Sequence, residues 1–178
     1  MQIQGLPVGP LQANCYFISK GEEMVLVDPG DEKEKIEYVI GDKKVVGILV
    51  THYHFDHIGA LDYFLNKYGL KANDKIKHFN YEILSTPGHS KDSLTFYFPN
   101  ENVMFTGDFL FKGTIGRMDL EGGDEKEMRE SLKQIFRYPS TIKIYPGHGS
   151  SSFLGEEKNG IVEKMREKIS SFLFSYTL

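Results

Sequence analysis

The segment THYHFDH, residues 51–57, places half of the chain's six histidines within six positions, together with an aspartate. Imidazole and carboxylate groups are common protein ligands of zinc and other transition metals. In an extended chain, side chains two residues apart leave on the same side, so His52 and His54 can bind one metal together. Asp56 and His57 follow where a helix is expected to begin, and adjacent side chains diverge there. They are better placed for a second metal.

Three further motifs carry the same residue types, each directly after an apolar segment. TPGHS follows YEILS, GD follows NVMFT, and PGHG follows TIKIY. If these segments are strands of the same sense in neighbouring sheets, their turns meet at one edge, where ligands commonly bind. A catalytic zinc takes three protein ligands, so the set is larger than one metal requires. The candidate ligands for two metals sharing a carboxylate are His52, His54, Asp56, His57, His89, Asp108 and His148.

Such a set indicates hydrolysis. A water held between two metals loses its proton more easily and becomes a nucleophile at neutral pH, while the metals polarise the substrate. No Ser–His–Asp or Cys–His pair is then required. Asp56, His57 and Asp108 are therefore candidate catalytic residues as well as ligands, with Asp108 as the bridging group. The sixth histidine, His78, is expected to be an ordinary packed or surface residue.

Length and composition limit the class of protein. The 178 residues, of which 40% are hydrophobic and 26% charged, predict one globular domain over 1–178. The net charge of −4 argues against nucleic acid or an anionic membrane as a partner. A small-molecule substrate is expected, and a monomer and a homodimer both remain open. The N-terminus lacks the features of a signal peptide, so a reducing cytoplasm is the expected location. The lone Cys15 is expected to be a small buried hydrophobe.

The pattern of apolar residues predicts mixed secondary structure, of the α/β or α+β class. Helices are expected over 31–41, 57–69, 124–137 and 159–174, the third capped by Asp124. The apolar C-terminal ISSFLFSYTL is expected to be a helix end docked on the core. Strands are expected near 2–8, 14–19, 23–28, 45–51, 80–85, 93–98, 102–106 and 141–145.

The motifs THYHFDH, TPGHS, TGD and YPGHG, in this order, resemble those of the metallo-β-lactamase superfamily. VLVDPGD, LQANCYF and GDFLFKGTIGRMDLEGGD extend the resemblance to its compact glyoxalase II-like branch, the hydroxyacylglutathione hydrolases. The resemblance implies an αβ/βα four-layer sandwich with a metal site at one edge of two facing sheets. It implies two divalent metal ions. Zinc is the expected metal, and the ligand set also suits iron or manganese.

The resemblance also implies roles for individual residues. Metal one takes His52, His54 and His89; metal two takes Asp56, His57 and His148; Asp108 bridges them. Asp28 resembles a carboxylate that orients a ligating imidazole from behind. Arg117 lies where glutathione-binding relatives place a basic residue, although an ion pair with Asp119 is an equal alternative. Lys112 and Tyr145 are further candidates for substrate binding, and Tyr145 has packing under the His148 turn as an alternative.

Two departures bear on the substrate. Only 31 residues separate His57 from His89, fewer than relatives usually have, and KDS follows TPGHS where relatives favour a Pro-Gly pair. The leading hypothesis is hydrolysis of a small thioester by a hydroxide bridging two metals. The alternative is a mononuclear-iron persulfide dioxygenase of the same superfamily, using His52, His89 and Asp108. Phosphodiester or RNA cleavage, β-lactam hydrolysis and a non-catalytic metal module rank lower.

Overall fold

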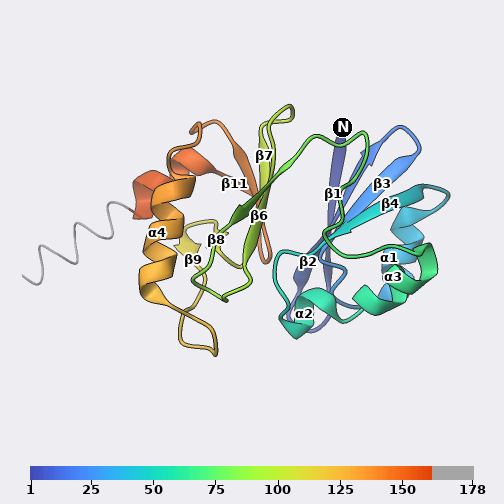
Figure 1. Ribbon diagram of the computed structural model, residues 1–178, viewed down its shortest axis with the longest axis horizontal. Helices are drawn as coiled ribbons and strands as arrows, with labels where there is room; N and C mark the ends of the chain where they lie inside the picture. Colours follow the sequence, from blue (N-terminus) through green and yellow to red (C-terminus); the bar gives the residue numbers. More distant parts are fainter. Residues whose placement is uncertain (162–178) are drawn as a thin grey trace, which may run out of the picture.

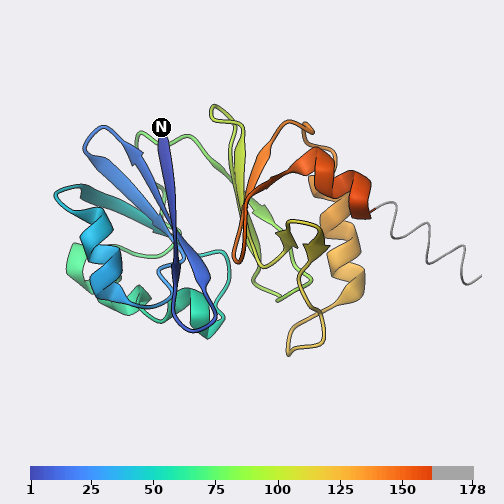
Figure 2. The ribbon, with the colours of Figure 1, turned by 180° about the vertical axis from the view of Figure 1, so that it is seen from behind.

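Two β-sheets face each other in the structure, a computed structural model that describes residues 1–161. The first sheet has the strand order β1-β2-β3-β4 and the second β11-β10-β7-β6-β5. Figures 1 and 2 show the sheets side by side with helices on their outer faces. The first sheet comprises β1 (Gln2–Val8), β2 (Ala13–Lys20), β3 (Glu23–Val27) and β4 (Lys44–Leu49). The second comprises β5 (Glu82–Ser85), β6 (Leu94–Phe98), β7 (Val103–Gly107), β10 (Lys143–Pro146) and β11 (Ser152–Phe153).

The helices complete a four-layer arrangement. Helices α1 (Lys33–Ile40) and α3 (Leu61–Tyr68) cover the first sheet, and α4 (Glu125–Ile135) covers the second (Figure 1). Residues 154–161 are also helical. A single turn, α2 (Phe55–Ile58), and a small hairpin of β8 (Leu110–Phe111) and β9 (Thr114–Ile115) complete the elements. The class is α+β, as the order of apolar segments predicted. In the described part of the chain, no helix has the length and apolar character needed to cross a membrane.

Strands buried on both faces explain why four layers form. Side chains alternate along a strand, so Phe17 packs outward toward α1 and α3 while its neighbour Tyr16 faces the other sheet. In the second sheet, Phe105 faces inward and Met104 packs on α4. Each large side chain buried in this way contributes about 1.5–3 kcal/mol to folding. The near-continuous apolar runs of the central strands are therefore required by packing on both faces.

Most predicted elements are confirmed, and the differences have local causes. The helix expected over 57–69 is interrupted, because Gly59 lies against the carbonyl of Gly30, where an added Cβ would be 2.3 Å from the oxygen. Ala60 N–H then donates to Pro29 O at 3.0 Å, which redirects the chain into α3. The N-cap expected of Asp124 is confirmed, since its side chain accepts from Glu127 N–H at 2.8 Å. Most of the helix predicted over 159–174, including ISSFLFSYTL, lies outside the described residues.

The strand directions bring the predicted turns to one edge. Strands β7 and β10 are parallel, and β5 and β7 are both antiparallel to β6, so all three end at the same edge. Backbone hydrogen bonds join the two sheets there. Asn14 N–H donates to Gly147 O at 2.6 Å, and Leu94 N–H donates to Thr51 O at 2.7 Å. This edge carries the histidine and aspartate residues.

Candidate metal centre

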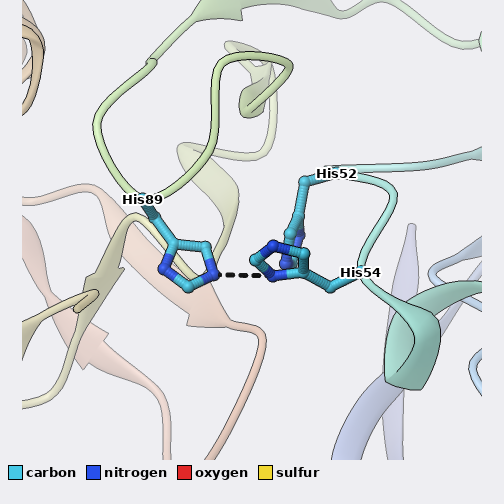
Figure 3. A group of neighbouring side chains, drawn as sticks. All are labelled: His52, His54 and His89. Atoms are coloured by element: carbon cyan, nitrogen blue, oxygen red, sulfur yellow. Dashed lines mark hydrogen bonds between the residues drawn. The ribbon is translucent and has the colours of Figure 1, made fainter. Parts of the chain in front are cut away.

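Three of the predicted ligands form a first cluster. The chain after β4 stays extended through His54, with φ −70° and ψ 146°, so His52 and His54 project together. The third imidazole, His89, comes from the turn after β5. Its Nε2 is 2.9 Å from His54 Nδ1, and the three rings turn their nitrogens toward a common point (Figure 3). One nitrogen from each lies within 4.8 Å of the others, the arrangement that three ligands of one ion require.

A second cluster lies next to the first and is built from α2 and the turn after β10. His148 Nε2 is 3.1 Å from Asp56 Oδ2, and His57 Nε2 is 3.6 Å from the same oxygen. Ligand-type atoms of Asp56, His57 and His148 all lie within 4.8 Å of one another. His57 is completely buried, whereas the other two are partly exposed. The structure therefore offers two three-residue groups, with the membership expected for metal one and metal two.

The Asp108 carboxylate lies between the two clusters. Its Oδ1 is 3.3 Å from His57 Nε2, and its Oδ2 is 3.6 Å from both His89 Nε2 and His148 Nε2. It is placed directly after β7 by Gly107, whose φ of 50° turns the chain out of the strand. A carboxylate in contact with imidazoles of both clusters has the position that a bridging ligand needs.

Four of the imidazoles are held from behind through Nδ1, which leaves Nε2 directed into the centre. His57 Nδ1 donates to Asp28 Oδ2 at 3.0 Å, the role expected of Asp28. His52 Nδ1 lies 3.1 Å from Thr51 Oγ1. His89 and His148 donate to backbone carbonyls, of Arg117 at 2.8 Å and of Leu11 at 3.1 Å. Such outer contacts fix the tautomer and orientation of metal-binding imidazoles.

Thr51 connects two of these contacts. Its hydroxyl donates to Asp28 Oδ2 at 2.6 Å and can therefore accept from His52 Nδ1. Asp28 also accepts from Thr51 N–H at 2.7 Å and from His57. A single buried carboxylate thus orients one imidazole of each cluster, the first through Thr51 and the second directly. Asp28 belongs geometrically to a further group with His52 and His57, but its oxygens are occupied by these hydrogen bonds.

Burial and neighbouring charges set the protonation of the centre. Burial, together with the adjacent His57, lowers the pKa of His52 to about 3. Burial also opposes protonation of His57, but Asp108 and Asp28 outweigh it and raise the pKa of His57 to about 10. For Asp108, burial would raise the pKa, but His57 lowers it to about 2. Near pH 7, His52 is therefore neutral and Asp108 ionised, the forms that bind metals, whereas His57 is protonated and must release a proton when it binds one.

The centre contains polar atoms that nothing in the described chain satisfies. Within residues 1–161, the buried side-chain nitrogens and oxygens without a hydrogen-bond partner are His52 Nε2, His57 Nε2 and Asp108 Oδ1. All three belong to the clusters. Leaving such atoms unpaired costs about 1–3 kcal/mol each. Imidazole nitrogens and carboxylate oxygens that converge in this way fit divalent transition metals, so the residues present match a metal centre.

The comparison with protein families follows the same residues. A sequence profile of the metallo-beta-lactamase superfamily matches residues 8–72 and 74–148. The chain belongs to this superfamily. The match includes every residue of the two clusters, and the four-layer fold described above is the fold of its solved members.

Two relatives extend along most of the chain. A probable metallo-hydrolase of Bacillus subtilis, YqgX, is 33% identical over 84% of this chain and 90% of its own length. The hydroxyacylglutathione hydrolase GloC of Haemophilus influenzae is 32% identical over 89% of this chain and 95% of its own length. Both similarities span the ligand motifs together with the strands that position them.

Solved structures show the same architecture. BLEG-1, a B3 metallo-beta-lactamase, superposes with a TM-score of 0.84 at 28% identity and covers 89% of this chain and 97% of its own. TTHA1623, solved in a di-iron-bound form, superposes with a TM-score of 0.78 at 32% identity and covers 86% of this chain and 96% of its own. ETHE1 of Myxococcus xanthus superposes with a TM-score of 0.82 at 23% identity and covers 90% of this chain and 83% of its own. At this identity the similarity shows the fold alone.

The residues proposed for substrate binding lie in different settings. The Arg117 guanidinium makes a bidentate ion pair with Asp119, at 2.8 and 2.6 Å. The backbone carbonyl of Arg117, not its side chain, contacts His89. Lys112 is exposed in the turn between β8 and β9. The ring of Tyr145 stacks on Phe105 at 5.2 Å between the sheets, a packing position. Substrate contact by Arg117, Lys112 or Tyr145 stays a prediction.

Several residues that build the site were not predicted from the sequence. Asn14 donates from Nδ2 to the carbonyls of Pro146 and Gly149 and holds the turn that carries His148. Tyr16 OH donates to Pro146 O at 2.6 Å. Leu11 acts through its backbone carbonyl, and Arg117, predicted for substrate binding, acts on His89 in the same way. A backbone carbonyl is the same in every residue, so the sequence had no signal for either role. Thr51 could have been found, because it directly precedes His52 and carries a hydroxyl.

Proposed function

We propose that the protein is a binuclear metallohydrolase that cleaves a small thioester. The observation that supports this most is the pair of three-residue ligand groups, each complete, sharing the Asp108 carboxylate. Metal one would be held by His52, His54 and His89, and metal two by Asp56, His57 and His148. The similarity to GloC of H. influenzae, a hydroxyacylglutathione hydrolase, supports the thioester as substrate class. Zinc is the proposed metal and a reducing cytoplasm the proposed location.

The chain's own groups have defined tasks in this reaction. Two bound metal ions would supply an acidified water and positive charge for the developing oxyanion. Asp56 and Asp108 carboxylates face the same space and can accept the hydrogen bond of the attacking water. The water oxygen bonds to the thioester carbon, the carbon–sulfur bond breaks, and the water proton passes by way of a carboxylate to the departing sulfur. Asp28 and Thr51 keep the imidazoles oriented throughout.

Activity in two ligand variants tests the proposal. His54→Ala removes one nitrogen of the first group, and Asp108→Ala removes the shared carboxylate. Each should lower kcat/KM for an acylthiol ester, with release of free thiol as the readout, by at least about a hundred-fold, comparable to the loss of a charge-stabilising group. His78→Ala is the matched control, because His78 is exposed and pairs with Glu23 away from the centre. Full activity in either ligand variant would exclude the assignment.

Iron chemistry is the second candidate, because TTHA1623, 32% identical, has been solved with iron bound, although with two irons. In a mononuclear-iron persulfide dioxygenase, His52, His89 and Asp108 would hold the metal. Elemental analysis of protein purified without chelator or added metal separates the two candidates. About two zinc ions per chain with thioester hydrolysis supports the hydrolase. About one iron per chain with oxygen consumption on a persulfide supports the dioxygenase.

A further inference from the structure

A pocket of about 310 Å³ opens beside the first ligand cluster. Three segments form it: Tyr53 and His54 after β4, residues 90–92 after β5, and residues 121–122 before α4. His54 belongs both to the cluster and to the pocket wall. A molecule whose reacting carbon lies at the metal centre can therefore extend directly into this pocket.

Hydrogen bonds between the three segments fix the walls. The Asp92 carboxylate accepts from Tyr53 N–H at 2.9 Å, which ties the first segment to the second. Ser90 Oγ and Ser93 Oγ, both buried, are 2.7 Å apart. Asp124 N–H donates to Gly88 O at 2.9 Å and holds the third segment against the second. These contacts hold the pocket walls in place, which lowers the ordering cost of binding.

The charged side chains that line the pocket differ in whether they are free to bind a ligand. Burial opposes ionisation of Asp92, but its hydrogen bonds with Ser90 and Tyr53 N–H outweigh burial and lower its pKa. The Asp92 carboxylate is thus anionic and already used in the wall. Lys91 and Glu121 are exposed, and within residues 1–161 neither forms a hydrogen bond or ion pair through its charged group. The pocket therefore offers a ligand one ammonium group beside two carboxylates, of which that of Asp92 already accepts a hydrogen bond in the wall.

We infer that this pocket binds the thiol-carrier end of the substrate, with Lys91 recognising a carboxylate on that carrier. The inference rests on the proposed thioester hydrolysis. The lysine ammonium attracts a carboxylate, whereas Glu121 in the same pocket repels a second negative charge. The exposed ring of Tyr53 supplies an apolar face for the carbon chain of the carrier. Thiol carriers with a single negative charge are therefore the preferred class. Lys91 belongs to the KDS segment that directly follows TPGHS.

The kinetic test compares two thioesters with the same acyl group. One has 3-mercaptopropionate as its thiol, and the other has the neutral amide of that thiol. The wild type should prefer the carboxylate in kcat/KM by about two- to five-fold, the size expected of one exposed ion pair. Lys91→Met should bring the ratio to one or below, because the Asp92 and Glu121 carboxylates remain, Lys91→Glu should lower it further, and Glu121→Gln should raise it above the wild-type ratio. Lys77→Met, which removes an exposed lysine outside the pocket, should leave the ratio unchanged.

A binding measurement tests the pocket independently of catalysis. Titration of isotope-labelled, zinc-loaded protein with 3-(methylthio)propionate should shift the backbone amide signals of Lys91 and Gly122, and the neutral amide should shift them less. Lys91→Met should abolish the difference. Hydrolysis with an unchanged carboxylate preference in Lys91→Met would overturn the inference about Lys91 and leave the proposed reaction standing. Lys91-dependent binding without hydrolysis of any thioester would instead overturn the proposed reaction and retain the anion-binding pocket.

Discussion

At the scale of single residues, the centre depends on what lies behind each imidazole. The hydroxyl of Thr51 accepts from His52 Nδ1 and donates to Asp28, which also orients His57. Thr51 is 2% exposed, so water cannot replace these contacts readily. One hydroxyl therefore influences imidazoles of both clusters. Loss of this hydroxyl should lower the affinity for metal more than it lowers the stability of the fold.

Thr51→Val provides the test, because valine keeps the shape of threonine and removes the hydroxyl. The variant should bind zinc about ten- to a hundred-fold more weakly, as is typical when an outer partner of a ligating imidazole is lost. Competition with a chromophoric chelator measures the affinity, and circular dichroism checks that the fold is intact. Thr51→Ser restores the hydroxyl and should recover most of the affinity. Equal zinc affinity in Thr51→Val and the wild type would show that the Asp28–Thr51–His52 chain does not orient the site.

The ligand residues could be predicted from the sequence, but most of their supports could not. Imidazoles at two-residue spacing beside Asp56 have no packing explanation, so His52, His54 and His57 stood out. Asn14 reads in the sequence as one polar residue at the start of a buried strand, although it holds the His148 turn. Tyr145 lies beside a ligand motif, and its ring stacks on Phe105 between the sheets, which matches the packing alternative while substrate contact stays a prediction.

At the scale of elements, the turns after the strands position the ligands by close backbone contact. Gly147, in the turn after β10, lies so near the centre that an added Cβ would be 2.1 Å from Asp108 Oδ1 and 2.7 Å from His57 Cε1. Its N–H donates to Gly107 O at 2.8 Å, which joins the turns after β7 and β10. The absence of a side chain at this position allows the two turns to meet around the ligands.

Gly147→Ala should therefore displace Asp108 or His57 rather than strain its own backbone. A displacement of about 1 Å in a reacting group can lower activity about a hundred-fold, and a loss of that order is expected in kcat. Gly149→Ala is the control in the same turn. Gly149 has φ 73° but open space where an added Cβ would lie, so alanine there should cost stability of about 1 kcal/mol and leave the centre in place. Similar losses of kcat in both variants would contradict this explanation.

The type of each element could be predicted from the apolar pattern. The position at which an element is interrupted depends on contacts between residues distant in the sequence, which the pattern does not show. The apolar run over 14–19 made β2 recognisable as a strand, and the structure shows its Tyr16 and Phe17 alternating between two apolar layers. The break between α2 and α3 depends on Gly59 lying against Gly30, and neither glycine signals that contact alone. The β8–β9 hairpin has only two residues in each strand, too few to produce a periodic pattern.

At the scale of the whole molecule, the ligands come from both sheets. His52, His54, Asp56 and His57 follow the first sheet, whereas His89, Asp108 and His148 follow strands of the second. Bound metal would therefore link the two halves of the sandwich at one edge. In its absence, the buried nitrogens and oxygens of the centre lack partners and weaken that same edge. Metal should consequently stabilise the whole fold, and the effect should need ligands from each half.

Zinc added at about 100 times its dissociation constant should stabilise the folded state by about 2.7 kcal/mol for each site that binds it only when folded. For a chain of this size, that corresponds to a rise in Tm of about 5–10 °C per site, measured by differential scanning calorimetry after chelator treatment. His52→Ala and His148→Ala each damage one cluster from opposite sheets and should each lose part of the rise, and His78→Ala should keep all of it. The same rise in wild type and His52→Ala would show that the first cluster does not bind zinc, because the variant damages only that cluster.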